Sequence, residues 1–171
     1  MTTVWTLGHS TRPLTEFLDL LDFHRIRALA DIRRFPASRR WPHFSGTALA
    51  AALGSRGIDY LWIPQLGGRR PPQPDSPNTG WRNAAFRGYA DHMASEDFAE
   101  GLDLLANLAL AEPTAMMCAE SLWWRCHRAL VADALVWCGF DVRHISSNAV
   151  VGHPGSAAAR LVDGRLSYAA P

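Results

Sequence analysis

The sequence contains no lysine, and all 17 of its basic residues are arginine. A GC-rich genome would produce the same bias, but the chemical exclusion holds whatever its origin. Lysine forms Schiff bases with carbonyl substrates, anchors pyridoxal phosphate and contacts phosphate in P-loops. We therefore expect none of these chemistries and no bound cofactor. Any anion site must be built from arginine, histidine or backbone N–H groups.

Cysteine, long apolar runs and net charge are also scarce. The three cysteines, Cys118, Cys126 and Cys138, are too few, and odd in number, for a disulfide scaffold. No apolar run reaches the length of about 18 residues that would indicate a membrane span. Residues 1–4 lack the basic region and apolar core of a signal peptide, which favours a cytoplasmic location. The net charge of +1 gives no general nucleic-acid signature, and nothing in the sequence indicates the oligomeric state.

The chain length suits one domain over residues 1–171, in which short apolar runs alternate with segments of helical periodicity. We expect strands at 4–7, 26–32, 58–63, 114–118 and 141–145. We expect helices from Pro13, after Ser45, near 86–93, after Ser95 and over about 124–138, the last ending at Gly139. This alternation predicts an α/β fold with a mainly parallel sheet of about five strands flanked by helices. Asp163-Gly164 predicts a short hairpin in the C-terminal extension 147–171.

Polar residues follow the predicted strands at the points where the strands end. His9, Ser10 and Arg12 follow the first strand, and Gln65 and Gly67-Gly68 follow the third. Asp31 and Arg33 close the second strand, Cys118 and Glu120 the fourth, and His144 and Ser146 the fifth. The carboxyl ends of parallel strands meet at one edge of a sheet, where sites of α/β proteins form. We therefore expect one polar site at this edge. The histidines His24, His92 and His153 are expected on the surface.

Carboxylates are the leading candidates for the chemistry of this site. Glu120, if it is buried directly after an apolar strand, would be the general acid or base. Asp31 would be a second carboxylate that positions water or a sugar hydroxyl, an arrangement suited to cleavage of an N-glycosidic bond. His9 would orient the substrate. In a variant of this mechanism, Cys118 is the nucleophile and His9 or His127 is its base.

The remaining candidates would bind the substrate. Arg12, Arg33 and Arg128 would hold anionic oxygens. Cys126 is expected at a helix start, where the helix dipole would lower the pKa of its thiol. The other proposed substrate-binding residues are Ser10, His127 and His144.

Arginine and aromatic residues are concentrated in the loops around the predicted site. The basic residues are Arg33, Arg34, Arg39, Arg40, Arg69, Arg70, Arg82 and Arg125, and the aromatic ones are Phe35, Trp41, Phe44, Trp81, Trp123 and Trp124. Residues 64–80, with five prolines and three glycines, form a long irregular loop of the kind that is usually functional. Arginine binds phosphate and aromatic rings stack on bases, so a phosphorylated small molecule or a nucleic acid is the expected partner.

These residues also carry a family resemblance. Six short motifs, taken in their order along the chain, resemble the domain-of-unknown-function 488 family. They are Gly8-His9-Ser10-Thr11-Arg12, Asp31-Ile32-Arg33 with Pro36 and Ser38, Leu66-Gly67-Gly68, Cys118-Ala119-Glu120, Cys126-His127-Arg128 and His144-Ile145. The resemblance covers residues 4–146 and implies a compact bacterial or archaeal α/β protein with a site at these motifs. It implies no particular reaction. The tail from Ser147 lies outside it, and the Pro-rich stretch 71–77 is longer than the family pattern.

Three functions remain open from the sequence. The first is a hydrolase that acts on a nucleotide, nucleoside or nucleic acid. The second is a non-catalytic domain that binds a nucleotide or nucleic acid. The third is a metal-binding or thiol-redox domain. A zinc site could use Cys118, Cys126, His127 and His9, but the spacing lacks the close ligand pairs of zinc motifs, and we expect no metal. A redox pair would require Cys118 and Cys126 to meet across eight residues without a Cys-x-x-Cys motif.

Overall fold

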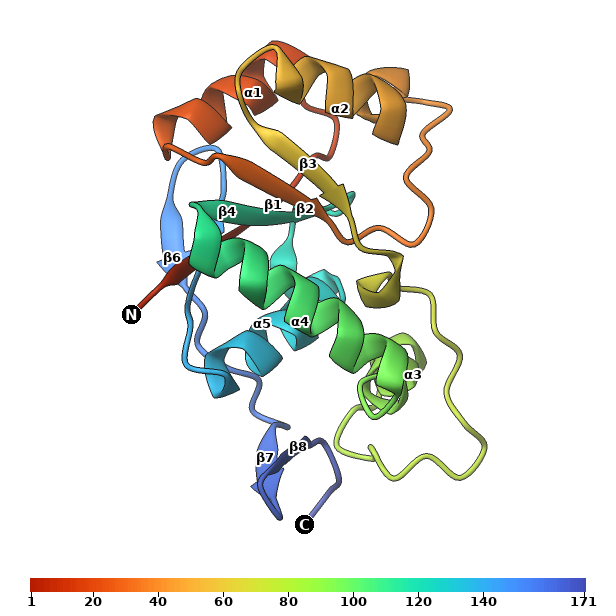
Figure 1. The fold of residues 1–171 in the computed structure, drawn as a ribbon. Coiled ribbons are helices and arrows are strands. Elements are labelled where there is room, and N and C mark those ends of the chain that lie inside the picture. Colours follow the sequence, from red (N-terminus) through yellow and green to blue (C-terminus); the bar gives the residue numbers. More distant parts are fainter.

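The computed structural model describes all residues 1–171 and shows an α/β fold around a six-stranded sheet (Figure 1). The strands are β1 (Thr3–Gly8), β2 (Ala28–Asp31), β3 (Asp59–Trp62), β4 (Thr114–Cys118), β5 (Asp141–Ile145) and β6 (Val150–Gly152), in the order β3-β2-β4-β1-β5-β6. All pairs are parallel except β5 with β6. The mainly parallel sheet and its five predicted strands are confirmed, and β6 is an addition that the sequence did not suggest.

Helices cover both faces of the sheet. In Figure 1, α1 (Leu14–Phe23) and α2 (Gly46–Gly54) lie on one face, and α3 (Ala84–His92), α4 (Glu96–Ala111) and α5 (Arg128–Trp137) lie on the other. Three short 3-10 turns, η1 (Pro42–Phe44), η2 (Pro64–Leu66) and η3 (Trp123–Arg125), interrupt the loops. Alternate strand residues serve the two cores: Leu29 and Met117 pack under α1 and α2, whereas Ala30 and Met116 face α4 and α5. None of the helices combines the length and apolar character needed to cross a membrane.

Local sequence signals account for most helix ends. The Ser95 hydroxyl accepts a hydrogen bond from the Phe98 N–H, which caps α4 as predicted. Ser45 precedes α2 as expected, but its side chain makes no cap bond to that helix. The helix predicted over 124–138 begins later, at Arg128, because residues 123–125 form the separate turn η3. Gly139 follows its end with a positive φ of 93°.

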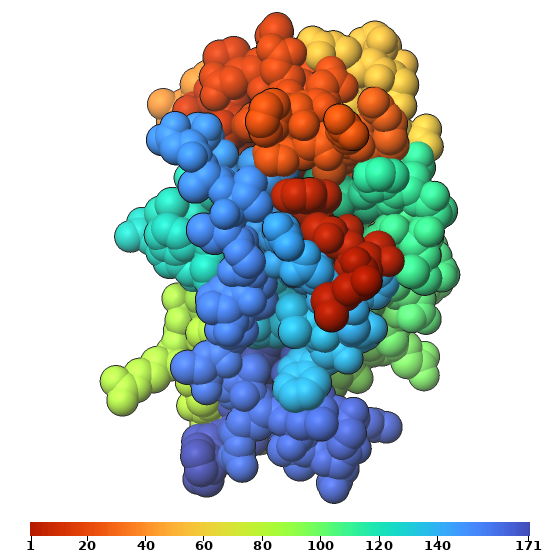
Figure 2. Space-filling model, turned by 90° about the vertical axis from the view of Figure 1, so that its left-hand side faces the viewer, coloured from red at the N-terminus to blue at the C-terminus, as the bar shows by residue number.

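The C-terminal segment returns along the whole molecule. Figure 2 shows it in blue, running from beside the orange helix α1 at the top to the hairpin at the bottom. The hairpin of β7 (Arg160–Val162) and β8 (Arg165–Ser167) is confirmed, with Asp163 and Gly164 both at positive φ in its turn. The next residue, Tyr168, is buried in the core beside α5 and anchors the segment.

The topology opens a crevice between β1 and β4. These strands are neighbours, and Gly8 lies opposite Cys118 where both strands end. The chain leaves β1 toward α1 on one face and leaves β4 toward α5 on the other. Divergence of two loops at neighbouring strand ends is the usual origin of a binding crevice in open α/β sheets.

Candidate functional site

A pocket of about 700 Å³ occupies this crevice. Seven of the predicted site residues line it: His9, Ser10, Arg33, Cys118, Glu120, Cys126 and His127. They come from the ends of β1, β2 and β4 and from the segment that precedes α5. The structure therefore brings together residues from four separate parts of the chain, as the argument from strand ends predicted.

The floor of the pocket is a backbone contact between two loops. The N–H groups of His9 and Ser10 donate to the carbonyls of Cys118 and Ala119, at 2.9 and 3.0 Å. Gly8 allows this approach, because a Cβ atom there would lie 1.8 Å from the Glu120 carbonyl oxygen. Ser10 turns the chain with a φ of 48°, which is rare for a residue other than glycine. The glycine at position 8 is thus a condition for the pocket floor.

Arg33 is fixed in the pocket wall by a fully buried carboxylate. Its Nε and Nη2 groups donate to the two oxygens of Asp31, at 2.9 and 2.7 Å. Asp31 also accepts from the Arg33 backbone N–H at 3.1 Å and from the Tyr60 hydroxyl at 2.6 Å. With four donors around it and no exposed surface, Asp31 does not line the pocket. A mechanism with two carboxylates has only one of them, Glu120, in the pocket.

His9 is buried and neutral. Its ring stacks on Phe44 with 4.4 Å between ring centroids, and burial lowers its pKa to about 4. Its Nδ1 lies 2.9 Å from the Ser10 carbonyl oxygen, which can only accept, so Nδ1 carries the hydrogen. The free electron pair of Nε2 then faces the Arg33 Nη1 group at 3.4 Å. We call Asp31, Tyr60, Arg33 and His9 the pocket network.

The two cysteines at the site are in contact. The sulfur atoms of Cys118 and Cys126 lie 2.9 Å apart, and both residues line the pocket while remaining almost fully buried. The Arg128 backbone N–H points at the Cys126 sulfur at 3.4 Å, as expected for a residue just before a helix. Burial favours the neutral thiol, but the Cys118 hydrogen bond and the Arg128 charge and N–H outweigh it and lower the pKa of Cys126. Burial raises the pKa of Cys118.

Arg128 supports the site from beneath. It is 1% exposed, and its Nη2 group donates to the carbonyls of Glu120 and Ser121, at 3.0 and 3.2 Å. It therefore holds the loop that carries Glu120 and does not face the pocket, contrary to the expectation that it would bind substrate directly.

Glu120 lines the pocket, but the burial expected for it is wrong. Its side chain is exposed because the chain turns outward after Cys118. Its Oε1 atom accepts from the Leu122 N–H at 3.1 Å, and its second oxygen has no partner in the chain. An exposed carboxylate beside a pocket can still accept a proton from water or substrate.

Arg12 and His144 lie outside the pocket. Arg12 donates to Gly8 O, Glu16 and Ser147, at 3.3, 3.3 and 2.6 Å, and so ties the loop after β1 to the C-terminal segment. His144 stacks on Trp123 with 4.3 Å between ring centroids, and burial lowers its pKa to about 3. Neither residue lines the pocket, and the expectation that they bind substrate stays a prediction.

His144 belongs to a second buried chain of hydrogen bonds, which we call the tail network: Thr6, His144, His153, Asp133 and Tyr168. The contacts are 2.6 Å from Thr6 to His144, 2.9 Å between the histidines and 2.7 Å from His153 to Asp133. Tyr168 donates to the other Asp133 oxygen at 2.7 Å. The expectation that His153 lies on the surface is wrong, since its side chain is fully buried here.

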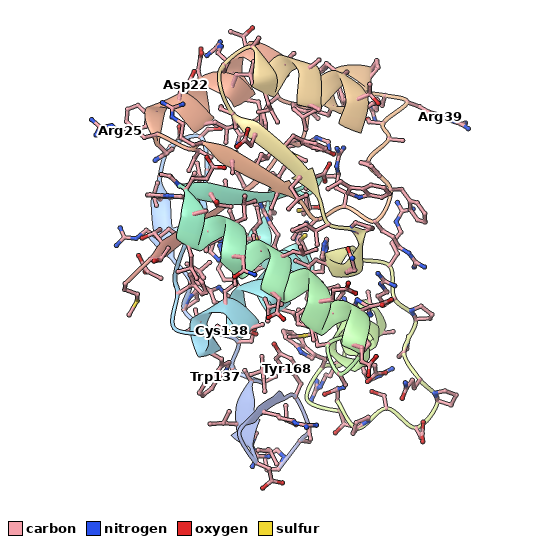
Figure 3. The ribbon with its side chains drawn as sticks, in the orientation of Figure 1. Asp22, Arg25, Arg39, Trp137, Cys138 and Tyr168 are labelled. Atoms are coloured by element: carbon pink, nitrogen blue, oxygen red, sulfur yellow. The ribbon has the colours of Figure 1, made fainter.

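The pocket mouth is rich in arginine. Arg34, Arg40, Arg69 and Arg125 join Arg33 in the lining, where Glu120 is the one acidic residue. The aromatic residues Phe35, Trp41, Phe86 and Tyr89 also line it. Arg39 does not, and Figure 3 shows it extended into solvent at the right. Half of the predicted basic and aromatic rim residues thus line the pocket, whereas Arg70, Arg82, Phe44, Trp81, Trp123 and Trp124 do not.

Sequence reasoning missed the tyrosines Tyr60 and Tyr89. Tyr60 is the donor that completes the Asp31 environment, and Tyr89 closes one wall beside His127 with 5.1 Å between their rings. Both lie inside elements rather than after strand ends, so the positional signal did not include them. The structure shows no cluster of three or more side chains able to hold a metal ion, including the four candidates for zinc.

Comparison with known proteins gives one match. Residues 13–135, well over half of the chain, match the family model described as domain of unknown function DUF488. No curated protein matches the chain. No solved structure matches it either.

Proposed function

The chain belongs to the DUF488 family, and we propose that it binds a nucleotide-sized phosphorylated ligand in this pocket and hydrolyses it. The main support for the proposal is the charge of the residues that line the pocket. Five arginines and one carboxylate surround the pocket of a chain whose net charge is only +1. Such a concentration of guanidinium groups around a cavity attracts and orients phosphate oxygens.

Among the arginines that line the pocket, Arg33 is the one best positioned to bind an anion. Its bidentate pair with Asp31 fixes the plane of the guanidinium, and its Nη1 group meets only the neutral His9 nitrogen at 3.4 Å. A phosphate oxygen can replace this long contact without breaking the ion pair. Arg34, Arg40, Arg69 and Arg125, at the mouth, would then hold further oxygens or a second phosphate.

The aromatic part of the lining suits a base or a sugar. Trp41 and Phe86 give flat apolar surfaces at the mouth, and the volume of about 700 Å³ is that of a pocket for a drug-sized molecule. Stacking on an aromatic ring is tolerant of base identity, so these residues favour the nucleotide class without selecting one base.

Glu120 would activate water for hydrolysis. It is the sole carboxylate in the lining, and one of its oxygens is held by the Leu122 N–H while the other is free. The free oxygen would take a proton from the attacking water, and the arginines would stabilise charge that develops on the ligand. A cytoplasmic location, expected from the sequence, is part of this proposal.

The binding half of the proposal is tested by calorimetry with adenosine 5′-monophosphate, ribose 5-phosphate and adenosine. We expect the nucleotide to bind most tightly and adenosine most weakly. Arg40→Ala should weaken binding of the nucleotide by about tenfold, equal to about 1.4 kcal/mol. Arg39→Ala is the matched control, because the neighbouring arginine points into solvent, and it should leave affinity unchanged. Equal losses in the two variants would count against this pocket.

The catalytic half is tested with Glu120→Gln, which keeps the shape and removes the proton acceptor. Adenosine 5′-monophosphate is incubated with the protein, and released phosphate and released adenine are measured separately. We expect the unmodified protein to release either phosphate or adenine. The variant should release neither, although it should still bind the nucleotide. Binding of the nucleotide without turnover by either protein would reject the hydrolase and leave a nucleotide-binding domain.

A further inference from the structure

The proposed hydrolysis makes no use of the cysteine pair at the pocket floor. Cys118 ends β4, and Cys126 stands between η3 and α5. The loop that joins them folds back so that their sulfurs meet at 2.9 Å. Arg128 holds this loop by its bonds to the carbonyls of Glu120 and Ser121. The approach of the two sulfurs is therefore part of a fixed structure that a buried arginine stabilises.

Either sulfur could donate in this contact, and the surroundings of the two sulfurs favour Cys118 as the donor. Cys126 receives the Arg128 N–H, which favours negative charge on its sulfur. Burial and the neighbouring Cys126 charge both raise the pKa of Cys118, so Cys118 keeps its hydrogen and donates it. Of the two thiols, Cys126 is therefore the one that loses its proton more readily, which is the arrangement of an attacking and a resolving cysteine.

His127 provides the base that removes the Cys126 proton. Its Nε2 atom lies 2.8 Å from the Ile32 carbonyl oxygen, an acceptor, so the ring hydrogen is on Nε2. The electron pair of Nδ1 then faces the Cys126 sulfur at 3.4 Å. Burial lowers the pKa of His127, which keeps the ring neutral and able to accept.

We propose that Cys118 and Cys126 are a redox-active dithiol, which hydroperoxides that enter the pocket oxidise to an intramolecular disulfide. His127 takes the Cys126 proton, the Cys126 thiolate attacks one peroxide oxygen, the O–O bond breaks, and the departing alkoxide takes this proton from His127 to become an alcohol. Cys126 is then a sulfenic acid. The Cys118 sulfur attacks it, the S–S bond forms, the S–O bond breaks, and hydroxide leaves with the Cys118 proton as water. Two electrons pass from the dithiol to the peroxide.

The movement required is small. A disulfide bond is about 2.05 Å long, so the sulfurs must approach by about 0.9 Å from their present distance. Both cysteines line the pocket, which gives a small peroxide a path to Cys126, while their burial keeps larger thiols away. Cys138 is exposed and lies at the end of α5, where Figure 3 labels it, so it takes no part.

The test uses the full chain with Cys138→Ser, which removes the exposed thiol and with it any link between molecules. The reduced protein is treated with one equivalent of hydrogen peroxide and its intact mass is measured. We expect a loss of two hydrogen atoms. Because trypsin cleaves after Arg87, Arg125 and Arg128, the link should join the peptides 88–125 and 126–128, and dithiothreitol should separate them.

Two further variants in the same background separate the roles. Cys118→Ser should leave Cys126 as a sulfenic acid that reacts with dimedone. Cys126→Ser should leave Cys118 unmodified at the same peroxide concentration. Circular dichroism checks that each variant is folded. If a variant is not folded, the disulfide measurement on the Cys138→Ser protein alone decides the test. Sulfinic acid on Cys126 of the parent without a disulfide, or equal reactivity of the two cysteines, would overturn the proposal.

The inference does not depend on the proposed ligand. The disulfide is detected by mass in the absence of any nucleotide, so a failure to bind adenosine 5′-monophosphate leaves it standing. Conversely, a protein that binds the nucleotide but gives no disulfide retains the proposed function and loses only the dithiol.

Discussion

The pocket network and the tail network are built from the same parts and do different things. In each, a buried aspartate accepts a tyrosine hydroxyl, at 2.6 Å for Asp31 and 2.7 Å for Asp133. In each, a buried histidine has a lowered pKa. The pocket network contains an arginine that faces a cavity, whereas the tail network runs from Thr6 to Tyr168 entirely inside the protein. Residue types alone therefore do not identify a site. A site is indicated by hydrogen-bonding groups that face a cavity and can still bind a ligand.

Asp31→Asn should have the largest effect. It removes the charge that neutralises the buried Arg33 and should lower the free energy of unfolding by about 3–5 kcal/mol. Binding of adenosine 5′-monophosphate should weaken as well, since Arg33 loses its orientation. Urea denaturation and calorimetry measure the two effects. The double variant Asp31→Leu with Arg33→Met should recover much of the stability but not the binding, and a loss below 1 kcal/mol for Asp31→Asn would reject the ion pair as a major contact.

Asp133→Asn should have an intermediate effect that is confined to the tail network. Asp133 accepts from His153, from the Ser156 N–H at 3.0 Å and from Tyr168. Weakening these bonds should cost about 2 kcal/mol and release the C-terminal segment. Hydrogen exchange should quicken over residues 153–169, while nucleotide affinity stays unchanged. A loss of affinity like that of Asp31→Asn would show that the two networks are not separate.

Acid should act on the two networks through their histidines. Burial lowers the pKa of His9 to about 4 and of His144 to about 3, from 6.5. As pH falls below 6.5 the unfolded chain binds protons that the folded protein excludes, so stability present above that pH is lost. Each histidine contributes a slope of about 1.4 kcal/mol per pH unit until its folded pKa is reached.

The measurement is the free energy of unfolding between pH 6.5 and 5, above the main titration of carboxylates. His144→Asn and His9→Asn should each lower the slope by up to about 1.4 kcal/mol per pH unit, and His127, whose pKa is also lowered, contributes to the slope that remains. If His144→Asn left the slope intact, the lowered pKa of His144 in the tail network would be rejected.

The sheet was predictable because its strands and the helices around it have clear local sequence patterns. The apolar run ending at Cys118 and the helical spacing after Ser95 required no knowledge of distant residues. The site edge followed from the parallel order alone. Strand β6 was not predictable, because its three exposed residues carry no pattern, and its antiparallel return is what brings His153 to His144.

The orientation of individual side chains could not be read from the sequence. Asp31 and Glu120 both lie near strand ends, yet Asp31 is the last residue of β2 and is enclosed by Arg33 and Tyr60, whereas Glu120 lies two residues beyond β4 and turns outward with the loop. The contact of Cys118 with Cys126 depends on how the intervening loop folds back, which a spacing of eight residues does not reveal. Such details are decided by tertiary packing.

The contact beneath Gly8 couples two parts of the chain sterically. A side chain there would collide with the Glu120 carbonyl, so a substitution of Gly8 would force the end of β1 and the loop 119–125 apart. The mouth of the pocket carries no such constraint at Arg40 or Arg69, which are exposed. Substitutions at the mouth can therefore change which ligand the pocket prefers without displacing its floor.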